Sequence, residues 1–289
     1  MKSPAFDYIK PRSLDEVFAL LAEYGDEARL LAGGQTLMAT LNMRLSEPSL
    51  LIDINAIDSL RGITQQGSML RIGALTRHSE VESSALVAQH APLLVMAAPH
   101  IAHRAIRNLG TFGGALAYAD PAAEWPTCVL ALDAVIVVRS ADAERRIAAA
   151  DFFVGLYTTA LQANEIVVAC EIPLRQPDAV FVFDELARRH GDYAIAGLAL
   201  AAQRAGPVLQ HTRLALLGIA STPVRARRTE QFLDGRPLLP ATLDEAAAML
   251  ATELDGALTP VADLTNSSAT KRHLATVLLR RALQTVVTA

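Results

Sequence analysis

The sequence predicts an α+β fold in two domains, and three observations support this prediction. Near the N-terminus, an amphipathic helix is followed by short apolar strands; three long strand-like runs lie beyond residue 179; and the C-terminal segment has helical periodicity. A chain of 289 residues is long enough for two medium domains, each with a hydrophobic core. The proline-bearing segment PLRQPDA (173–179) is the predicted boundary, which gives domains near 1–175 and 176–289.

The first predicted helix begins at a capping box. In SLDE (13–16), Ser13 is the expected N-cap and Glu16 the third helical residue, and apolar residues then follow at helical spacing until Gly25. The elements expected after it are a strand and glycine turn at 28–34, a helix at 36–45, strands at 49–54 and 69–76, and helical pieces within 78–106.

The rest of the chain alternates strand and turn signals before it becomes helical. Strands are expected at 134–140 and 165–173, and the second domain is expected to contain a three-stranded antiparallel sheet and helices. The strand-like runs are 180–186, 194–204 and 212–220, and the helical runs are 222–233, 241–250 (with Thr242 and Glu245 as a second capping box) and 269–287.

Composition excludes several classes of protein. The chain is 52% apolar with a formal net charge of −4, so neither disorder nor nucleic-acid binding is expected. We find no secretory signal and no apolar run that spans a membrane, which predicts a cytoplasmic protein. The only cysteines, Cys128 and Cys170, sit in apolar runs and are expected to be buried thiols; they are too few to ligate a [2Fe–2S] cluster with four cysteines.

The first candidate binding motif is AGGQT (32–36), which follows a strand-like stretch. Adjacent glycines let consecutive backbone amides turn inward as an anion-binding nest. Thr36 adds a hydroxyl group and begins a predicted helix, whose N-terminus favours phosphate. Taken alone, the motif fits a plain β-turn before a helix equally well.

The second candidate motif, TFGGALAYADPAAE (111–124), places Gly113 and Gly114 before two acids. The glycines would weaken a strand, which suggests that a ligand approaches the backbone there. Asp120 as N-cap, Pro121 at the first helical position and Glu124 in the first turn also form a helix start. The two acids are therefore open to either interpretation, helix cap or ligand contact.

Together, two amide-lined loops would neutralise the diphosphate of a dinucleotide without a run of basic side chains. The segments LLAGGQTLMATLNMRL and IRNLGTFGGALAYADPAAE resemble the two FAD-binding signatures of the flavoprotein (medium) subunit of molybdenum hydroxylases. This family includes the medium subunit of carbon monoxide dehydrogenase and the FAD domain of xanthine dehydrogenase. The resemblance extends to EIP (171–173), ARRHGDYAIAG (187–197) and RRAL near the C-terminus.

The resemblance implies a two-subdomain FAD-binding domain of the vanillyl-alcohol-oxidase (PCMH) type, followed by the α+β C-terminal domain of carbon monoxide dehydrogenase flavoproteins. It implies FAD as the cofactor, with the diphosphate in the two loops and Tyr193 stacked on the flavin. The implied cofactor-binding residues are Leu31, Ala32, Gly33, Gly34, Gln35, Thr36, Leu37, Ile101, Thr111, Phe112, Gly113, Gly114, Ala115, Asp120, Glu124, Val167 and Tyr193.

Five positions depart from the family pattern. Thr36 replaces the commoner serine and keeps the hydroxyl group, Ala39 stands where proline is frequent, and Leu109 replaces an arginine. Ala115 lacks the serine or asparagine side chain found in relatives, so a side-chain contact is expected to be lost while the backbone amide remains. Glu185 stands where many relatives have a lysine near the flavin.

The resemblance also implies partners and a role. A molybdopterin-binding large subunit and a [2Fe–2S] small subunit would join this chain in a dimer of heterotrimers, and the chain would pass electrons from the clusters through FAD to an external acceptor. Two alternatives are a self-contained FAD-dependent oxidoreductase and a non-enzymatic scaffold subunit. His100 and His103 lack a third ligand nearby, so no metal site is predicted. No catalytic side chain is predicted on this chain either.

Overall fold

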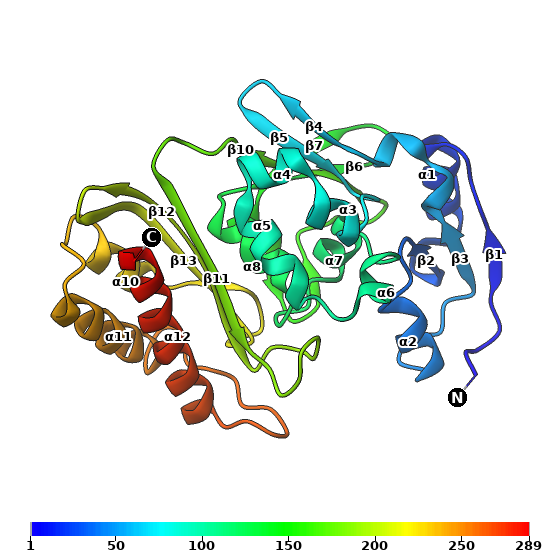
Figure 1. Cartoon of the computed structure of the whole chain (residues 1–289). Coiled ribbons are helices and arrows are strands. Elements are labelled where there is room, and N and C mark those ends of the chain that lie inside the picture. Colours follow the sequence, from blue (N-terminus) through cyan, green and yellow to red (C-terminus); the bar gives the residue numbers. More distant parts are fainter. Residues whose placement is uncertain (1, 289) are drawn as a thin grey trace.

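The structure, a computed structural model, describes residues 2–288 and places three sheets one after another (Figure 1). The N-terminal sheet has the strand order β1-β3-β2, and both of its strand pairs are parallel. Its elements are β1 (Asp7–Ile9), α1 (Leu14–Tyr24), β2 (Ala28–Leu31), α2 (Leu37–Asn42) and β3 (Leu50–Asp53).

The middle sheet is antiparallel, with the strand order β4-β5-β10-β6-β7, and its helices lie between it and the C-terminal sheet (Figure 1). Its strands are β4 (Ile63–Gln66), β5 (Met69–Gly73), β6 (Val135–Arg139), β7 (Glu144–Ala148) and β10 (Ile166–Pro173), and a hairpin is formed by β8 (Phe153–Gly155) and β9 (Thr158–Thr159). The helical segments are α3 (His78–Ser83), α4 (Ala85–His90), α5 (Pro92–Ala97), the 3-10 turn η4 (Ala98–His100), α6 (Arg104–Arg107), α7 (Phe112–Tyr118), α8 (Glu124–Ala131) and α9 (Ala149–Phe152).

The C-terminal sheet has four strands where the sequence predicted three. The three long strands pair as expected, and a two-residue strand, β14, adds to the edge of β13. A strand this short has no periodicity, so sequence patterning could not reveal it. The elements are β11 (Ala179–Leu186), β12 (Ala196–Ala205), β13 (Val208–Leu217), β14 (Val224–Arg225), α10 (Arg227–Leu233), α11 (Pro240–Leu254) and α12 (Ser268–Thr288).

Both faces of this sheet are covered, which explains why its strands are apolar almost throughout. Helices α10 and α12 contact one face, and α5 and α8 of the preceding domain contact the other. Leu198 and Leu200 of β12 join the cluster under α12, whereas the intervening Ala199 joins the core of the middle region. Small alanines on that second face let α8 pack closely against the sheet.

The two predicted capping boxes have different outcomes. Ser13 is the N-cap of α1, and its Oγ accepts the Glu16 N–H at 3.2 Å, as predicted. The second box is wrong, because α11 already begins at Pro240 and Thr242 lies inside its first turn. Pro at the first helical position starts the helix without a side-chain cap. Within residues 2–288, no helix is long and apolar enough to cross a membrane.

Candidate functional site

The first glycine loop (32–36) joins β2 to α2. A Cβ atom at Gly33 would collide with the carbonyl oxygen of Leu109 and would lie 2.7 Å from the Cα of Gly110. Gly34 has a φ of +70°, a conformation that residues with a side chain rarely adopt. Both glycines are therefore required by the fold of the chain itself.

The backbone amides of this loop are free of protein partners. Within the described residues, the N–H groups of Gly33, Gly34, Gln35 and Thr36 donate to no protein acceptor. The Gln35 side chain instead donates to the Gly33 carbonyl oxygen at 2.9 Å. Consecutive unpaired amides form an anion-binding concavity, and they need water or a ligand to accept from them. The loop therefore has the donor set that a diphosphate requires.

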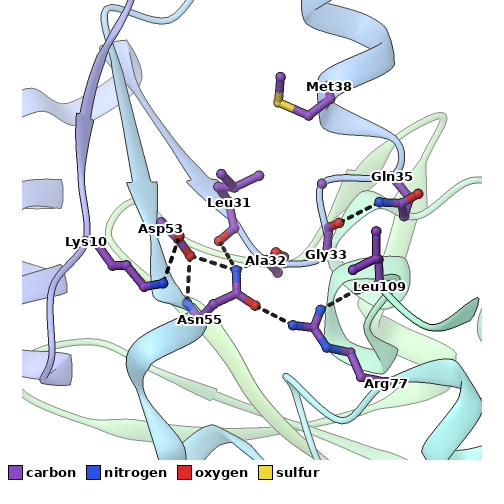
Figure 2. Close-up of a pocket in the computed structure, with 11 residues that line it drawn as sticks. Lys10, Leu31, Ala32, Gly33, Gln35, Met38, Asp53, Asn55, Arg77 and Leu109 are labelled. Atoms are coloured by element: carbon purple, nitrogen blue, oxygen red, sulfur yellow. Dashed lines mark hydrogen bonds and ion pairs between the residues drawn. The ribbon is translucent and has the colours of Figure 1, made fainter. Parts of the chain in front are cut away.

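A cavity of about 500 Å³ lies beside the loop (Figure 2). Because β2 and β3 are parallel and Leu31 pairs with Asp53, the residues that follow the two strands meet at one edge of the sheet. The cavity is lined by Lys10, Leu31, Ala32, Gly33, Gly34, Gln35, Met38, Asp53, Asn55, Arg77 and Leu109.

One wall of the cavity is a hydrogen-bond network centred on Asn55 (Figure 2). Asn55 Nδ2 donates to Asp53 Oδ1 at 2.7 Å and to the Ala32 carbonyl oxygen at 2.6 Å. Arg77 Nη2 donates to Asn55 Oδ1 at 2.8 Å, and Arg77 Nη1 donates to the carbonyl oxygen of Leu109. This network connects the first glycine loop to the segment that precedes the second.

Asp53 is the acidic side chain of this wall, and the cationic side chains of Lys10 and Arg77 line the same cavity. Burial raises its pKa, but hydrogen bonds from the Tyr8 hydroxyl and from Asn55 outweigh burial, so the net pKa is lowered. The Lys10 ammonium lies 3.6 Å from Asp53 Oδ2. Lys10 and Arg77 thus place positive charge in the lining of the cavity that holds the free amides.

Five residues of the cavity were not predicted from the sequence: Lys10, Met38, Asp53, Asn55 and Arg77. A signal existed for two of them, because Asp53 and Asn55 come at the end of a buried strand, as the first glycine loop does. The carboxyl ends of neighbouring parallel strands meet at one edge, which would have brought them together. Lys10 and Arg77 reach the cavity from segments whose position depends on the tertiary fold.

The second glycine loop is anchored to the protein, which corrects its prediction as an amide-lined loop. It opens helix α7, and the N–H groups of Phe112 and Gly113 donate to the carbonyl oxygens of Thr76 and Ala74, each at 2.9 Å. A Cβ at Gly113 would lie 2.5 Å from the Cβ of Ala74. The Ala115 amide is not available either, since it donates to the Thr111 carbonyl oxygen at 3.1 Å.

Two groups of the second loop do remain open to a ligand. Thr111 is only 2% exposed, and its Oγ1 has no hydrogen-bond partner within the described residues. The N–H of Gly114 likewise donates to no acceptor there. A Cβ at Gly114 would lie 2.6 Å from Thr111 Oγ1 and 3.8 Å from the Cβ of Ala32 in the first loop. The two loops therefore approach each other at Gly114, beside a buried hydroxyl that has no protein partner.

Asp120 does not cap α8, so the predicted helix start at this residue is wrong. Helix α8 begins at Glu124, and its N-cap is Ala123. Asp120 Oδ1 instead accepts the N–H of Ala122 at 2.9 Å, which closes a local turn. Ala119 caps the C-terminus of helix α7 in the left-handed conformation, and the chain changes direction there before α8 begins. Burial raises the pKa of the Asp120 carboxyl.

Glu124 holds its proton at neutral pH. Burial is the main cause, and the nearby charges of Glu185 and Asp120 add to it, so the pKa of Glu124 is raised to about 8. Glu185 lies on β11, and its charge is the second cause of this raised pKa. The position where the sequence departs from the family is therefore a neighbour of a predicted cofactor-binding acid.

The remaining predicted site residues lie outside the 500 Å³ cavity. Ile101 follows η4, and its carbonyl oxygen accepts from Arg107 at 3.1 Å. Val167 is buried on β10 at a bulge in its pairing with β6. Tyr193 is 67% exposed in the β11–β12 connection, near the acids Asp120 and Glu124, whose charges add to the effect of partial burial in raising its pKa.

Sequence comparison identifies both parts of the chain. Residues 4–175 match the family described as the FAD binding domain in molybdopterin dehydrogenase, and residues 181–286 match the CO dehydrogenase flavoprotein C-terminal domain. The alpha subunit of the 6-hydroxypseudooxynicotine dehydrogenase complex of Paenarthrobacter nicotinovorans is 41% identical over 235 residues, which is 81% of this chain and 79% of the relative.

Solved structures agree over the whole chain. The carbon monoxide dehydrogenase of Hydrogenophaga pseudoflava, in a form that lacks the Mo-pyranopterin moiety of the molybdenum cofactor, aligns with a TM-score of 0.95 at 35% identity, covering 100% of this chain and 99% of the other. Quinoline 2-oxidoreductase of Pseudomonas putida 86 aligns with a TM-score of 0.93 at 36% identity, with the same coverage. The expected fold, a PCMH-type FAD-binding domain followed by an α+β domain, is confirmed.

Proposed function

The chain belongs to the family of FAD-binding subunits of molybdopterin dehydrogenases, and we propose that it holds FAD in its two glycine loops as the electron-transfer subunit of a heteromeric oxidoreductase. In this proposal, [2Fe–2S] clusters of a small subunit supply electrons and an external acceptor removes them. A molybdopterin-binding large subunit oxidises the substrate, and the complex is a dimer of heterotrimers in the cytoplasm. The proposed division of this chain is 1–175 for FAD and 176–289 for the C-terminal domain.

The unpaired donors at the junction of the two loops carry this proposal. The first loop offers four consecutive N–H groups without protein acceptors, and the second offers the Thr111 hydroxyl and the Gly114 N–H. The Thr111 hydroxyl is buried, and buried polar groups in native proteins are almost always satisfied, so its lack of a partner calls for an explanation. A diphosphate accepts from all of these donors, which is why the residues present fit FAD.

The other predicted residues would bind the remaining parts of FAD. We assign Leu31 and Leu37 to the entry and exit of the first loop, and Ile101 and Val167 to apolar contacts. Tyr193 has the exposed ring that a stacking contact needs. The remaining proposed contacts are Ala32, Gly33, Gly34, Gln35 and Thr36 in the first loop, Thr111 and Gly114 in the second, and the acids Asp120 and Glu124. Phe112, Gly113 and Ala115 would hold the second loop in position, because their amides donate within the protein.

FAD supplies the redox chemistry in this proposal, and the chain binds and orients it. The two cysteines fit this role, because both are buried and burial raises the pKa of each thiol, which keeps them protonated and inert. The relatives are named for substrates as different as carbon monoxide, quinoline and 6-hydroxypseudooxynicotine. We therefore place substrate selection on the partner subunit.

The test is the flavin content of the full chain, purified alone and with the large and small subunits. We expect one FAD per chain by absorbance of the denatured supernatant, and reduction of this flavin by substrate only in the assembled complex. Oxidation of an organic substrate by the isolated chain would instead support a self-contained oxidoreductase. A chain that never takes up FAD, alone or assembled, would support a scaffold role and overturn the proposal.

A further inference from the structure

The supports of the two glycine loops are joined by hydrogen bonds from residues that belong to neither loop. Asn55 Nδ2 donates to the Ala32 carbonyl oxygen of the first loop at 2.6 Å, and Asn55 Oδ1 accepts from Arg77 Nη2 at 2.8 Å. Arg77 Nη1 donates to the carbonyl oxygen of Leu109, two residues before Thr111 (Figure 2). One guanidinium group therefore connects the first loop to the segment that leads into the second.

This connection closes on itself, because the first loop also lies directly against Leu109. A Cβ at Gly33 would lie 2.4 Å from the Leu109 carbonyl oxygen, so at this point backbone packs against backbone. The carbonyl group that accepts from Arg77 is thus the one beside Gly33, the neighbour of Ala32. A shift of this carbonyl group would change the position of the first loop relative to the second.

The backbone of Arg77 is itself fixed to the second loop. Arg77 and Thr111 form an antiparallel β-bridge, and the residues on either side of Arg77 make backbone hydrogen bonds of 2.9 and 3.0 Å to the residues on either side of Thr111. Glu80 Oε2 accepts the Arg77 N–H at 2.6 Å at the start of α3. Arg77 therefore pairs with the second loop through its backbone and supports the first through its side chain.

The arrangement suits these two residue types. A guanidinium group is planar and holds its donors at a fixed spacing, so its two terminal nitrogens reach acceptors on two different segments, whereas lysine has the same charge on one nitrogen. The Asn55 amide is used at both ends, since Nδ2 donates to Ala32 and Oδ1 accepts from Arg77. These bonds use none of the loop N–H groups, nor the Thr111 hydroxyl, that we assign to FAD.

We propose that Arg77 and Asn55 are positioning residues that hold the two loops at the spacing that FAD requires. This inference rests on the proposed function, in which donors of both loops bind one diphosphate. The apparent affinity for such a ligand is reduced by the fraction of molecules in which the loops stand at the binding distance. The Arg77–Asn55 pair keeps that fraction high before FAD binds, so both residues act on FAD affinity through the loops.

The main test is Arg77→Lys, which keeps the charge but has a single donor nitrogen. Stopped-flow measurement of flavin fluorescence with the FAD-free full chain gives the association and dissociation rate constants of FAD. We expect affinity to fall about tenfold through slower association, because fewer molecules hold the loops at the binding distance. The dissociation rate and the absorbance spectrum of bound FAD should stay unchanged. Wild-type affinity in this variant, or a loss that lies entirely in faster dissociation, would overturn the proposal.

Asn55→Ala and the double variant test whether the two residues act together. Each substitution breaks the same connection between the loops, so we expect the double variant to lose no more affinity than the weaker-binding single variant. Losses that multiply in the double variant would mean that the two residues act independently, and would overturn the proposal. If Asn55→Ala does not fold, Arg77→Lys alone decides.

Arg61→Lys is the matched control. Arg61 Nη2 donates to the Asn55 backbone carbonyl oxygen at 2.8 Å, and within the described residues it donates to no group of either loop. This variant removes an arginine hydrogen bond from the same asparagine but leaves the connection between the loops intact, so FAD affinity should match wild type. A loss as large as that of Arg77→Lys would overturn the proposal. A wild-type chain that never binds FAD contradicts the proposed function instead.

Discussion

The two glycine loops look alike in sequence but present different surfaces. In the first loop, four successive backbone N–H groups are free, and the cavity that they line also contains Lys10 and Arg77. In the second, Phe112 and Gly113 donate to the segment after β5, and the free groups are the Thr111 hydroxyl and the Gly114 amide. The first loop thus offers several unpaired backbone donors, whereas the second is held mainly by hydrogen bonds within the protein.

The four glycines of the two loops are required for different reasons. Gly33 and Gly113 are required because the chain packs against itself at both positions, and Gly34 is required by its positive φ. At Gly114, by contrast, the only close contact of an added Cβ is with the Thr111 side chain, and the Cβ of Ala32 in the first loop lies at an ordinary contact distance of 3.8 Å. A pair of adjacent glycines is therefore weak evidence for a bound ligand. Of the four glycines, only Gly114 is not explained by backbone packing or by a positive φ.

Gly114→Val has the largest expected effect. The valine side chain would occupy the junction of the two loops beside the Thr111 hydroxyl, so we expect FAD affinity to fall at least about 100-fold, which corresponds to about 2.7 kcal/mol. The contact of its Cβ within the protein is with a side chain rather than with backbone, and loss of a helical glycine offsets part of the strain. Far-UV circular dichroism should stay unchanged while FAD is lost on gel filtration. Stoichiometric FAD in this variant would disprove the assignment of this junction to FAD.

Gly113→Ala tests the opposite expectation one residue earlier. The new Cβ would lie 2.5 Å from the Cβ and 2.6 Å from the Cα of Ala74, and backbone cannot move aside cheaply. We expect the free energy of unfolding to fall by about 1–3 kcal/mol in urea titrations of the FAD-free chain. Gly67→Ala controls for a general cost of replacing a glycine, since a Cβ there meets nothing within 4 Å, although its positive φ adds strain of its own. Unchanged stability of Gly113→Ala would mean that the loop is not anchored as described.

Thr111→Val separates a structural hydroxyl from a ligand-binding one. Valine has the same shape but lacks the Oγ1 that is buried without a partner. We therefore expect the FAD-free chain to become slightly more stable, by up to about 1 kcal/mol, while FAD affinity falls about tenfold. Thermal unfolding with and without FAD measures both. A variant that loses stability and keeps its FAD affinity would assign the hydroxyl to the fold alone.

These differences show which features of the fold and of the candidate site can be predicted from the sequence. Apolar runs and the Ser13 cap predicted the strands and the first helix because both depend on local pattern. The acids after the second loop were misplaced because a left-handed Ala119 ends α7 and delays α8 until Glu124, and nothing in an alanine announces that conformation. Arg77 was missed because its hydrogen bonds to Asn55 and Leu109 join segments far apart in the chain. Which amides stay free is likewise a property of tertiary pairing.

Glu124→Gln has the smallest expected effect and tests the raised pKa of the acid that follows the second loop. The pKa of Glu124 rises from 4.5 to about 8 on folding, so between these pH values the folded chain holds a proton that the unfolded chain releases. Stability must then decrease as the pH rises through this window. Glutamine removes the dependence, and we expect the variant to match wild type near pH 4.5 and to be more stable by about 1 kcal/mol at pH 8, an amount reduced by solvent access to the carboxyl. Urea titrations of the FAD-free proteins at both pH values measure this gap. A stability difference that is the same at the two pH values would mean that folding does not raise the pKa of Glu124.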